Sequence, residues 1–336
     1  MSRCSQANCR IAETGVCLDG HKQGCPHLLP DEPTAGPSPD EAASPATDAT
    51  TAPESRRFHT GEKLTISEAS QLLNERPAQV VLCVGAQWSG KTTFLARVGE
   101  MFRDGSFARY RFGGSLTLCA FERASWRATI ASGAERPDTP RTQRRENDTF
   151  LHLRVYPAGD SAGHLALLIS DLAGETFPTA VASRDFCADL RSLARVDHLV
   201  VFLDCAQLAD QVKRHPECDN ARGFLQQVRT VKHQPTALQV HVVFSRWDYV
   251  TRHTERAALE KFCEATQAEF TERFSSCFAS IEFWRIAARP DGGIPPTNDA
   301  IRSLFTRWLE IPVHAPAPPA VRNRHPARDF CGFGLI

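Results

Sequence analysis

The sequence predicts an α/β fold in three layers, with a mostly parallel sheet between two layers of helices. Strand-like and helix-like patterns alternate from residue 60 to residue 310. A glycine-rich loop joins the first clear strand to the first clear helix. Two strands, 149–156 and 165–170, are separated by the turn 157–160, which is too short for a crossover helix. We therefore expect one antiparallel strand, at an edge of the sheet.

Each element of this fold follows from the spacing of its apolar residues. A buried strand is expected at Gln79–Val84, and a helix is expected after it at Thr92–Phe102. The remaining strands are expected at 116–121, 149–156, 165–170, 198–203, 240–244 and 281–286. The remaining helices are expected near 182–195, 220–232, 254–270 and 298–309. Because helices separate most of these strands, the strands should run parallel to one another.

The loop Gly85–Thr92 matches the whole pattern G-x-x-x-x-G-K-[ST], which defines a phosphate-binding loop, or P-loop. The strand and the helix around it aim backbone N–H groups and a helix N-terminus at one place, which forms an anion site. Lys91 is expected to reach the β- and γ-phosphates, and Thr92 to complete a Mg²⁺ shell. The predicted architecture is thus a P-loop NTPase three-layer sandwich. The predicted phosphate-contacting residues are Gly85, Ser89, Gly90, Lys91, Thr92 and Thr93.

A second motif, Asp171-Leu172-Ala173-Gly174, directly follows the apolar strand 165–170. An aspartate at a strand end can hold Mg²⁺ through water, and a glycine three residues later lets a backbone N–H approach the γ-phosphate. The alternative is an acidic residue that only starts a turn. The position of the motif, about 80 residues after the P-loop, favours a functional role for Asp171 and Gly174.

A third motif, Ser245-Arg246-Trp247-Asp248, follows the strand 240–244. With these motifs in this order, the chain resembles P-loop GTPases of the translation-factor-related (TRAFAC) class, whose guanine motif is [NT]-K-x-D. The resemblance implies that Asp248 binds guanine N1 and N2, that the stem of Arg246 lies on the purine face, and that the amide of Ala288 meets guanine O6. Two letters of the motif differ here, and a strand-end S-x-x-D is also a common helix cap.

The same resemblance implies residues that act at the γ-phosphate. Glu175 stands where many such enzymes carry the glutamine that orients the attacking water, so slow intrinsic hydrolysis is expected. The long segment 103–148 takes the place of switch I, and both Thr142 and Thr139 are candidates for its threonine. This segment is rich in arginine, which fits either a solvated insertion or an arginine finger. The predicted catalytic residues are Lys91, Glu175 and Thr142. The predicted Mg²⁺ ligands are Thr92, Asp171 and Thr142.

Within this class, the chain resembles the bacterial double-GTPase-domain families of conflict and defence systems. The resemblance rests on the order of motifs, the long switch I insert and the phrase Thr149–Leu153, and it covers about residues 78–310. It implies a GTP/GDP switch that acts with protein partners or by self-association. Two rival functions stay open. One is a P-loop ATPase, although Leu172 follows Asp171 where a second acidic residue is usual, and the other is a nucleotide-dependent scaffold with little turnover.

The N-terminal segment predicts a zinc-binding head, because four cysteines fall in a stretch too short for a hydrophobic core. These cysteines are Cys4, Cys9, Cys17 and Cys25. Their spacing has no tight C-x-x-C, so a disordered leader is the alternative. The expected domains are the head at 1–29, a disordered linker rich in Pro, Ala, Ser and Thr at 30–57, the GTPase domain at 58–311 and an irregular tail at 312–336.

Composition limits the remaining choices. A formal net charge of +0 gives the chain no overall field toward nucleic acid or anionic lipid. The sequence contains no run of 18 apolar residues, and Met1–Gln6 does not begin a signal-peptide core, so a cytoplasmic location is expected.

Overall fold

The computed structural model describes residues 3–4, 28–29, 59–75, 78–105, 107–126, 149–158, 164–290 and 294–310. The chain divides into two compact units, Met1–Arg56 and Arg57–Ile336. The described elements of the first unit are β1 (Arg3–Cys4) and β2 (Leu28–Leu29), which pair antiparallel. The side chain of Cys4 lies outside the described part of the chain, as do Cys9, Cys17, Cys25, the linker at 30–57 and the tail at 312–336. The zinc-binding head therefore stays a prediction.

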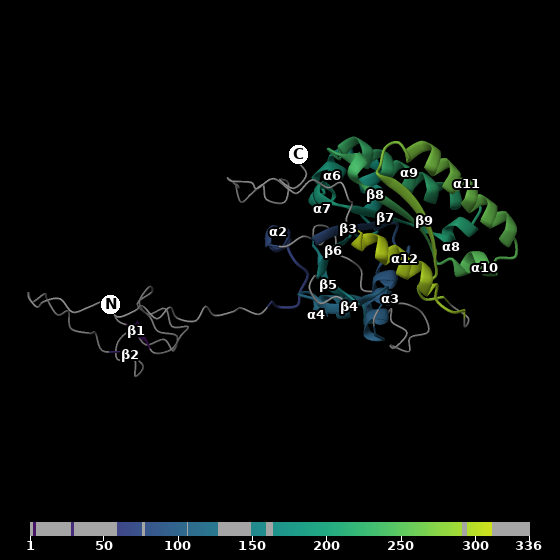
Figure 1. Ribbon diagram of the computed structural model, residues 1–336. Coiled ribbons are helices and arrows are strands. Elements are labelled where there is room, and N and C mark those ends of the chain that lie inside the picture. Colours follow the sequence, from purple (N-terminus) through teal and green to yellow (C-terminus); the bar gives the residue numbers. More distant parts are fainter. Residues whose placement is uncertain are drawn as a thin grey trace, which may run out of the picture. The chain divides into compact units, whose positions relative to one another are not determined.

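A seven-stranded sheet forms the centre of the second unit (Figure 1). In spatial order its strands are β4 (Tyr110–Gly114), β5 (Leu151–Pro157), β6 (Leu165–Asp171), β3 (Ala78–Gly85), β7 (His198–Asp204), β8 (Gln239–Ser245) and β9 (Ser280–Ile286). β5 is antiparallel to both of its neighbours, whereas β6, β3, β7, β8 and β9 run parallel. The predicted mostly parallel sheet with one antiparallel strand is confirmed.

One edge of the sheet differs from the prediction. Residues 116–121 were expected as a strand, but they enter the helix α4 (Leu118–Ser125), and the strand β4 precedes them. The strand path stops at Thr117, whose hydroxyl accepts a hydrogen bond from the backbone N–H of His152 at 2.8 Å. Phe121 then packs so closely on the preceding helix, α3 (Lys91–Arg103), that a Cβ at Gly99 would lie 2.4 Å from its ring. Because β4 lies outside β5, the antiparallel strand is second in the sheet and not at its edge.

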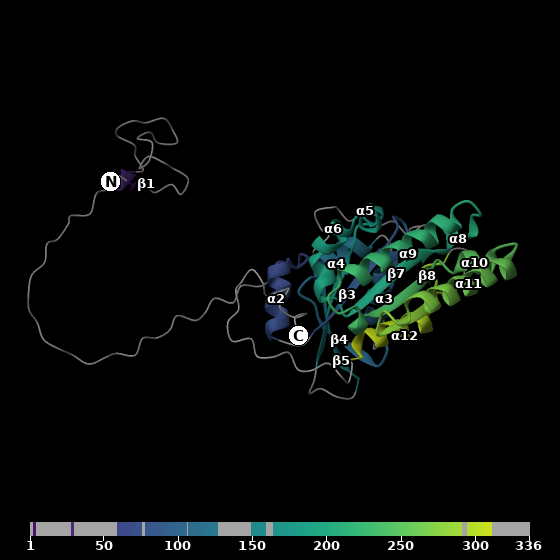
Figure 2. The same ribbon diagram turned by 90° about the horizontal axis from the view of Figure 1, so that it is seen from above.

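Helices cover both faces of the sheet (Figure 1, Figure 2). One layer contains α3 (Lys91–Arg103), α4 and α12 (Asn298–Leu309), which share an apolar core with the residues of β3 that include Val81 and Cys83. The opposite face of β3, with Leu82 and Val84, packs on the other layer. The main helices of that layer are α9 (Arg214–Val231) and α11 (Arg256–Phe274). With helices on both sides, the central strands are apolar on both faces, and this explains their uninterrupted hydrophobic runs.

The shorter helices of the second layer correct one prediction. The helix expected near 182–195 is three short helices, α5 (Phe177–Ala182), α6 (Arg184–Asp189) and α7 (Arg191–Arg195). Ser183 and Leu190 interrupt them because both have extended backbones, and the Ser183 hydroxyl accepts from the N–H of Phe186 at 3.2 Å to cap α6. The prediction also missed three short helices that the structure contains, namely α2 (Ile66–Glu75), α8 (Cys205–Ala209) and α10 (Asp248–Arg252).

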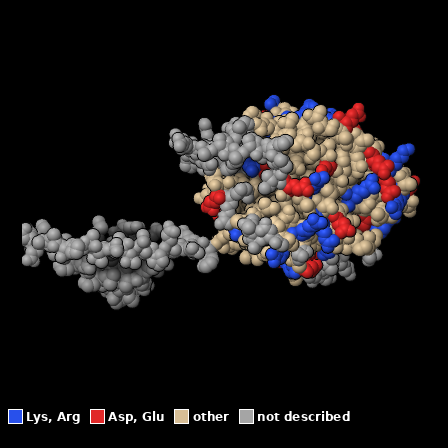
Figure 3. Space-filling model, in the orientation of Figure 1, with Lys and Arg blue, Asp and Glu red and all other residues tan. Residues whose placement is uncertain are grey.

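The surface of the second unit carries both signs of charge. On the face drawn in Figure 3, basic and acidic side chains are interspersed over the described residues. This mixture agrees with a formal net charge of +0. None of the helices in the described ranges combines the length and the apolar character that a membrane crossing needs.

Candidate functional site

The predicted motifs meet at one edge of the sheet, where the parallel strands end. The P-loop follows β3, Asp171 ends β6, Ser245 ends β8, and Ala288 comes just after β9. The carboxyl edge of a parallel sheet is where such folds bind ligands. The fold thus places residues that are up to about 200 positions apart in the sequence around one candidate nucleotide site.

Lys91 is the first residue of α3 and is buried beneath the P-loop, with 7% of its surface exposed. Its ammonium donates hydrogen bonds to the carbonyl oxygens of Gly85 (3.0 Å) and Ala86 (3.1 Å). The ammonium also lies 3.5 Å from the Ser89 hydroxyl. Burial lowers the pKa of Lys91, while the nearby Asp171 carboxylate acts in the opposite direction. An ammonium has three protons, and here two carbonyls and the Ser89 hydroxyl accept from it, so a phosphate oxygen would replace the long contact with Ser89.

Two glycines give the P-loop its shape. Gly85 has φ 150° and Gly90 has φ 86°, which are backbone conformations that residues with a Cβ rarely adopt. At Gly85 a Cβ would also lie 2.8 Å from the carbonyl oxygen of Phe202 on β7. Between them, Trp88 takes φ 68° with 59% of its surface exposed, an uncommon combination for a bulky residue. The loop is therefore built mainly from backbone geometry.

Two of the predicted Mg²⁺ ligands lie together. The Thr92 hydroxyl donates to the Asp171 carboxylate at 3.1 Å, although the two residues are 79 positions apart. A hydroxyl and a carboxylate are oxygen donors of the kind that Mg²⁺ prefers, and phosphate oxygens and water fill the rest of its shell. In the described ranges no group of three or more His, Cys, Asp or Glu residues is placed to hold a metal by itself. The pair therefore fits a metal that arrives with a phosphate.

Gly174 packs directly against the P-loop. A Cβ at this position would lie 2.6 Å from the Cα of Gln87 and 2.7 Å from its backbone N. The chain after β6 is fixed there, because the N–H of Leu172 donates to the Cys83 carbonyl at 3.0 Å. Glu175, the next residue, is exposed. The structure thus places Gly174 beside the loop, whereas Thr142 and Thr139 lie outside the described residues.

The end of β8 lies near the P-loop. A Cβ added to Gly90 would come within 3.8 Å of the Cβ of Ser245, which is an ordinary van der Waals distance. The Ser245 hydroxyl donates to the Leu203 carbonyl of β7 at 3.0 Å. The serine therefore holds β8 to β7 through its hydroxyl, close to Gly90.

Asp248, the predicted base-reading residue, begins α10 and is 4% exposed. Its carboxylate accepts a hydrogen bond from Arg252, one turn further along this helix, at 2.6 Å. A carboxylate has about four lone-pair sites, so it can accept more hydrogen bonds than this one. The loop is held toward β9 because the N–H of Trp247 donates to the Ile286 carbonyl at 3.1 Å.

Arg246 is anchored by an ion pair that the sequence did not reveal. Its guanidinium forms a two-point contact with the carboxylate of Asp204, the last residue of β7, with Nε 2.7 Å from Oδ1. Arg246 has φ 51°, and its guanidinium carbon lies 5.2 Å from the centre of the Tyr249 ring. Asp204 is also bound by Glu217, in the first turn of α9. Oε1 of Glu217 accepts a hydrogen bond from the backbone N–H of Asp204 at 2.9 Å.

The residues after β9 complete this edge. Thr297, just before α12, accepts a hydrogen bond at its hydroxyl from the N–H of Ala287 at 2.8 Å, and its own N–H donates to the Ala287 carbonyl at 3.0 Å. Ala288 follows with 9% exposure. The predicted amide of Ala288 therefore lies in a segment that α12 holds in place.

Sequence reasoning missed Asp204, Glu217 and Arg252. One signal could have found Asp204, because it follows an apolar strand in the same way as Asp171 does. Arg252 stands four residues after Asp248, which is the spacing of an ion pair on a helix. Glu217 carries no local signal, since its partner is the backbone of a strand 13 residues earlier.

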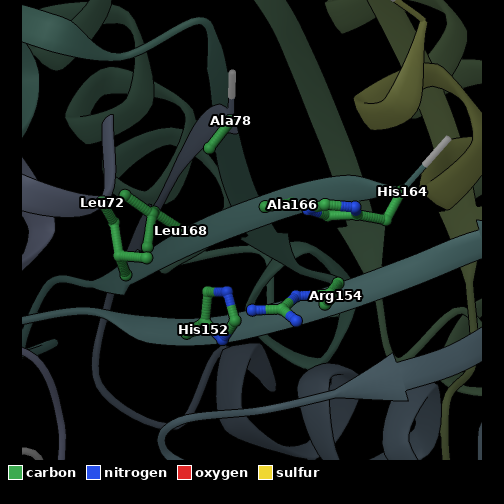
Figure 4. Close-up of a pocket in the computed structure, with 7 residues that line it drawn as sticks. All are labelled: Leu72, Ala78, His152, Arg154, His164, Ala166 and Leu168. Atoms are coloured by element: carbon green, nitrogen blue, oxygen red, sulfur yellow. The ribbon is translucent and has the colours of Figure 1, made fainter. Parts of the chain in front are cut away.

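A small cavity lies away from these motifs (Figure 4). It is formed by α2 and the strands β3, β5 and β6, and its lining residues are Leu72, Ala78, His152, Arg154, His164, Ala166 and Leu168. Burial lowers the pKa of His152 to about 4, so this imidazole is neutral at neutral pH. The lining is mostly apolar and contains none of the predicted phosphate or base residues. We interpret this cavity as a packing gap under α2.

The chain can now be compared with known proteins. A family model described as Double-GTPase 2 matches residues 79–309. Among solved structures, the chain is similar to one titled "Signal recognition particle receptor SRb-GTP/SRX complex from Chaetomium thermophilum", with 13% identity, 69% of this chain and 99% of that chain covered, and a TM-score of 0.37. That structural likeness is too low to support an argument, and a search of curated proteins found no match. Because the family model spans more than half of the sequence and includes the P-loop, Asp171–Gly174 and Ser245–Asp248, the chain belongs to the Double-GTPase 2 family.

Proposed function

We propose that this protein is a GTP-binding molecular switch that hydrolyses GTP slowly and acts with partner proteins, as part of a bacterial conflict or defence system in the cytoplasm. One observation supports the nucleotide site most strongly. The P-loop lysine, the Thr92–Asp171 pair, Gly174 and the Asp248 loop all lie at the carboxyl edge of one parallel sheet. Membership of the Double-GTPase 2 family supports GTP as the nucleotide.

The residues of the chain would divide the work of holding GTP. The P-loop backbone and Lys91 would bind the β- and γ-phosphates, which places positive charge where negative charge collects during phosphoryl transfer. Thr92 and Asp171 would hold Mg²⁺, which neutralises charge on the phosphate oxygens. Asp248 would accept hydrogen bonds from guanine N1 and N2, and the Ala288 amide would donate to O6. Thr142 would complete switch I in the presence of the γ-phosphate.

Glu175 supports slow turnover. It stands directly after Gly174, which packs against the P-loop, and its side chain is exposed, which suits a contact with an attacking water. A carboxylate there adds negative charge close to the γ-phosphate, which opposes the reaction unless a partner changes the site. A partner or a second copy of the chain would then set the rate. A scaffold that keeps GTP bound differs from this switch only in its hydrolysis rate.

Competitive binding measurements with GTP, GDP and ATP test the base. In the presence of Mg²⁺, the full chain should bind GTP at least about tenfold more tightly than ATP, the ratio that one lost base hydrogen-bond pair would produce. Asp248→Asn should remove most of this preference while it leaves binding of inorganic tripolyphosphate unchanged. Equal affinity for GTP and ATP in the unmodified chain would refute the guanine assignment.

Single-turnover hydrolysis tests the rate. We expect a rate constant below about 1 s⁻¹, the low end of ordinary turnover numbers. Glu175→Gln should raise this rate if the negative charge of Glu175 slows the reaction. A faster unmodified enzyme would contradict the slow switch. Complete absence of hydrolysis in both proteins, with tight GTP binding, would favour the scaffold.

A further inference from the structure

We infer that Asp204, supported by Glu217, is a positioning residue for the base site, which fixes Arg246 so that its aliphatic stem forms the platform for a purine. This inference rests on the proposed function, because it names the residues that would prepare the site for its base. It concerns positions that lie between the recognised motifs in the sequence, at the end of β7 and in the first turn of α9.

The contact between Arg246 and Asp204 has the geometry of a fixed pair. Two of the three guanidinium nitrogens, Nε and one terminal nitrogen, bind the two oxygens of one carboxylate. The Asp204 side chain is 2% exposed and that of Arg246 is 33% exposed. A two-point contact of this kind sets the direction of the side chain as well as its distance. The guanidinium is therefore held inward, and the stem is the part of Arg246 that remains for a ligand.

Besides Arg246, one backbone N–H binds the buried carboxylate of Asp204, and Glu217 holds the main chain of the same residue. Its Oδ1 accepts from the N–H of Ala206 at 2.9 Å, and its own N–H donates to Glu217 Oε1 at 2.9 Å. Glu217 is itself 7% exposed, so two acidic side chains share one buried region. Such an arrangement costs free energy through desolvation, and apolar residues of similar volume often stabilise a protein better. We attribute its presence to the position that it imposes on Arg246.

The network also reaches Asp248. Two guanidinium groups lie near the Tyr249 ring, that of Arg246 at 5.2 Å and that of Arg252 at 5.7 Å from its centre. Arg252 in turn binds the Asp248 carboxylate. The stacking platform and the residue that reads the base edge are thus connected through one aromatic ring. Stacking acts on the face of any purine, whereas Asp248 acts on an edge that differs between guanine and adenine.

This division of labour gives a specific test with the full chain. The probes are GTP, ITP and inorganic tripolyphosphate, each measured by calorimetry with Mg²⁺. Asp204→Asn releases the guanidinium of Arg246, and we expect roughly tenfold weaker binding of both GTP and ITP, as for the loss of one stacking contact. Tripolyphosphate has no base, so its affinity should stay unchanged. Equal loss for tripolyphosphate would show a general structural defect and overturn the inference.

A double-mutant cycle tests whether the two residues act together. Arg246→Ala should weaken GTP binding by about the same factor, and the double variant with Asp204→Asn should bind no more weakly than Arg246→Ala alone. Additive losses would overturn the inference. The matched control is Glu269→Gln, which breaks a similar two-point pair with Arg222 between α9 and α11. It should leave all three affinities unchanged.

Two further outcomes keep the test decisive. If Asp204→Asn does not fold, Arg246→Met replaces it, because methionine keeps an unbranched stem but cannot form the two-point contact with Asp204. Unchanged GTP affinity in Arg246→Met would overturn the inference. The proposed function fails separately, when the unmodified chain binds GTP no better than ATP. If the unmodified chain prefers GTP strongly and the Asp204→Asn variant binds GTP as tightly as the unmodified chain, only the role of Asp204 is refuted.

Discussion

The phosphate half and the base half of the candidate site are built in different ways. The phosphate half consists of eight consecutive residues, Gly85–Thr92, and its shape depends on two glycines with positive φ. The base half consists of side chains from separate elements, which ion pairs and a tyrosine ring hold together. The first half is fixed by backbone geometry and the second by side-chain charge.

This difference has a consequence for how each half fails. The shape of the P-loop depends mainly on its backbone and little on its side chains. Nucleotide binding should therefore be lost when atoms are added to the loop or when Lys91 is removed. A network of buried charges responds to any change in charge, including a change of pH. Loss of the lysine in the phosphate half should therefore weaken nucleotide binding more than it lowers stability. A change of buried charge in the base half should instead change stability and its dependence on pH.

The largest expected effect is on Lys91. Lys91→Met should weaken GTP binding at least about a hundredfold, because the charged donor to the phosphates is lost. The free energy of unfolding should change by no more than about 1 kcal/mol, since relief of a buried charge offsets two lost hydrogen bonds. Calorimetry and urea unfolding measure these two quantities. The control is Lys232→Met. Lys232 directly follows α9, and its ammonium donates to the carbonyls of Leu193 and Ala194 and has no role at the P-loop.

The Lys232→Met variant should keep its full affinity for GTP. If it loses affinity as Lys91→Met does, then the effect of Lys91 is a general effect of removing a buried lysine. A Lys91→Met protein that unfolds outright would contradict the idea that this lysine is retained for binding and not for stability.

The next effect is a pH dependence in the base half. Burial raises the pKa of Glu217 to about 7 from 4.5, and among the charges that face it, Asp204 raises this pKa while Lys91 and Arg246 lower it. The folded protein thus holds this proton more tightly than the unfolded chain does. Its contribution to stability is complete below about pH 4.5 and is lost as the pH rises through about 7, and it amounts to at most about 3 kcal/mol.

Urea unfolding of the unmodified chain and of Glu217→Gln measures this contribution. The difference in free energy of unfolding between the two proteins should change between pH 5 and pH 8, with the unmodified chain losing more stability toward pH 8. The control is Glu282→Gln. The imidazole of His241, whose Nδ1 lies 3.6 Å from Oε2 of Glu282, lowers the pKa of Glu282, so its contribution is lost only as the pH falls below about 4.5. A pH-independent difference for Glu217→Gln would contradict the prediction.

The smallest effect is expected where atoms are added at Gly174, which packs against the phosphate half. In Gly174→Ala the new methyl group would overlap the backbone of Gln87, so the P-loop must move. We expect roughly tenfold weaker GTP binding and a loss of about 1–3 kcal/mol in stability, a typical result of overpacking. Gly105→Ala is the control, because a Cβ there meets nothing within 4 Å although φ is 139°. It should lower stability through strain and leave GTP affinity unchanged.

How well the sequence predicted the molecule depended on the range of each signal. The strand–loop–helix at 79–102 and the helix at 298–309 were predicted closely, because their apolar periodicity and their glycines are local. The strand expected at 116–121 was wrong. The apolar residues of this segment also fit the spacing of a helix. The hydrogen bond from His152 of β5 to the Thr117 hydroxyl fixes the residue just before Leu118, where the helix begins.

By itself, the sequence determined the phosphate half. Its residues are contiguous, and a glycine or a lysine at a fixed spacing has the same backbone consequences wherever it occurs. Only the tertiary structure determined that Asp204 and Glu217 lie behind Arg246, and that Arg252 binds Asp248. Such contacts depend on which strands are neighbours and on how deeply their ends are buried. The strength of an ion pair follows from that burial, and no spacing along the chain specifies it.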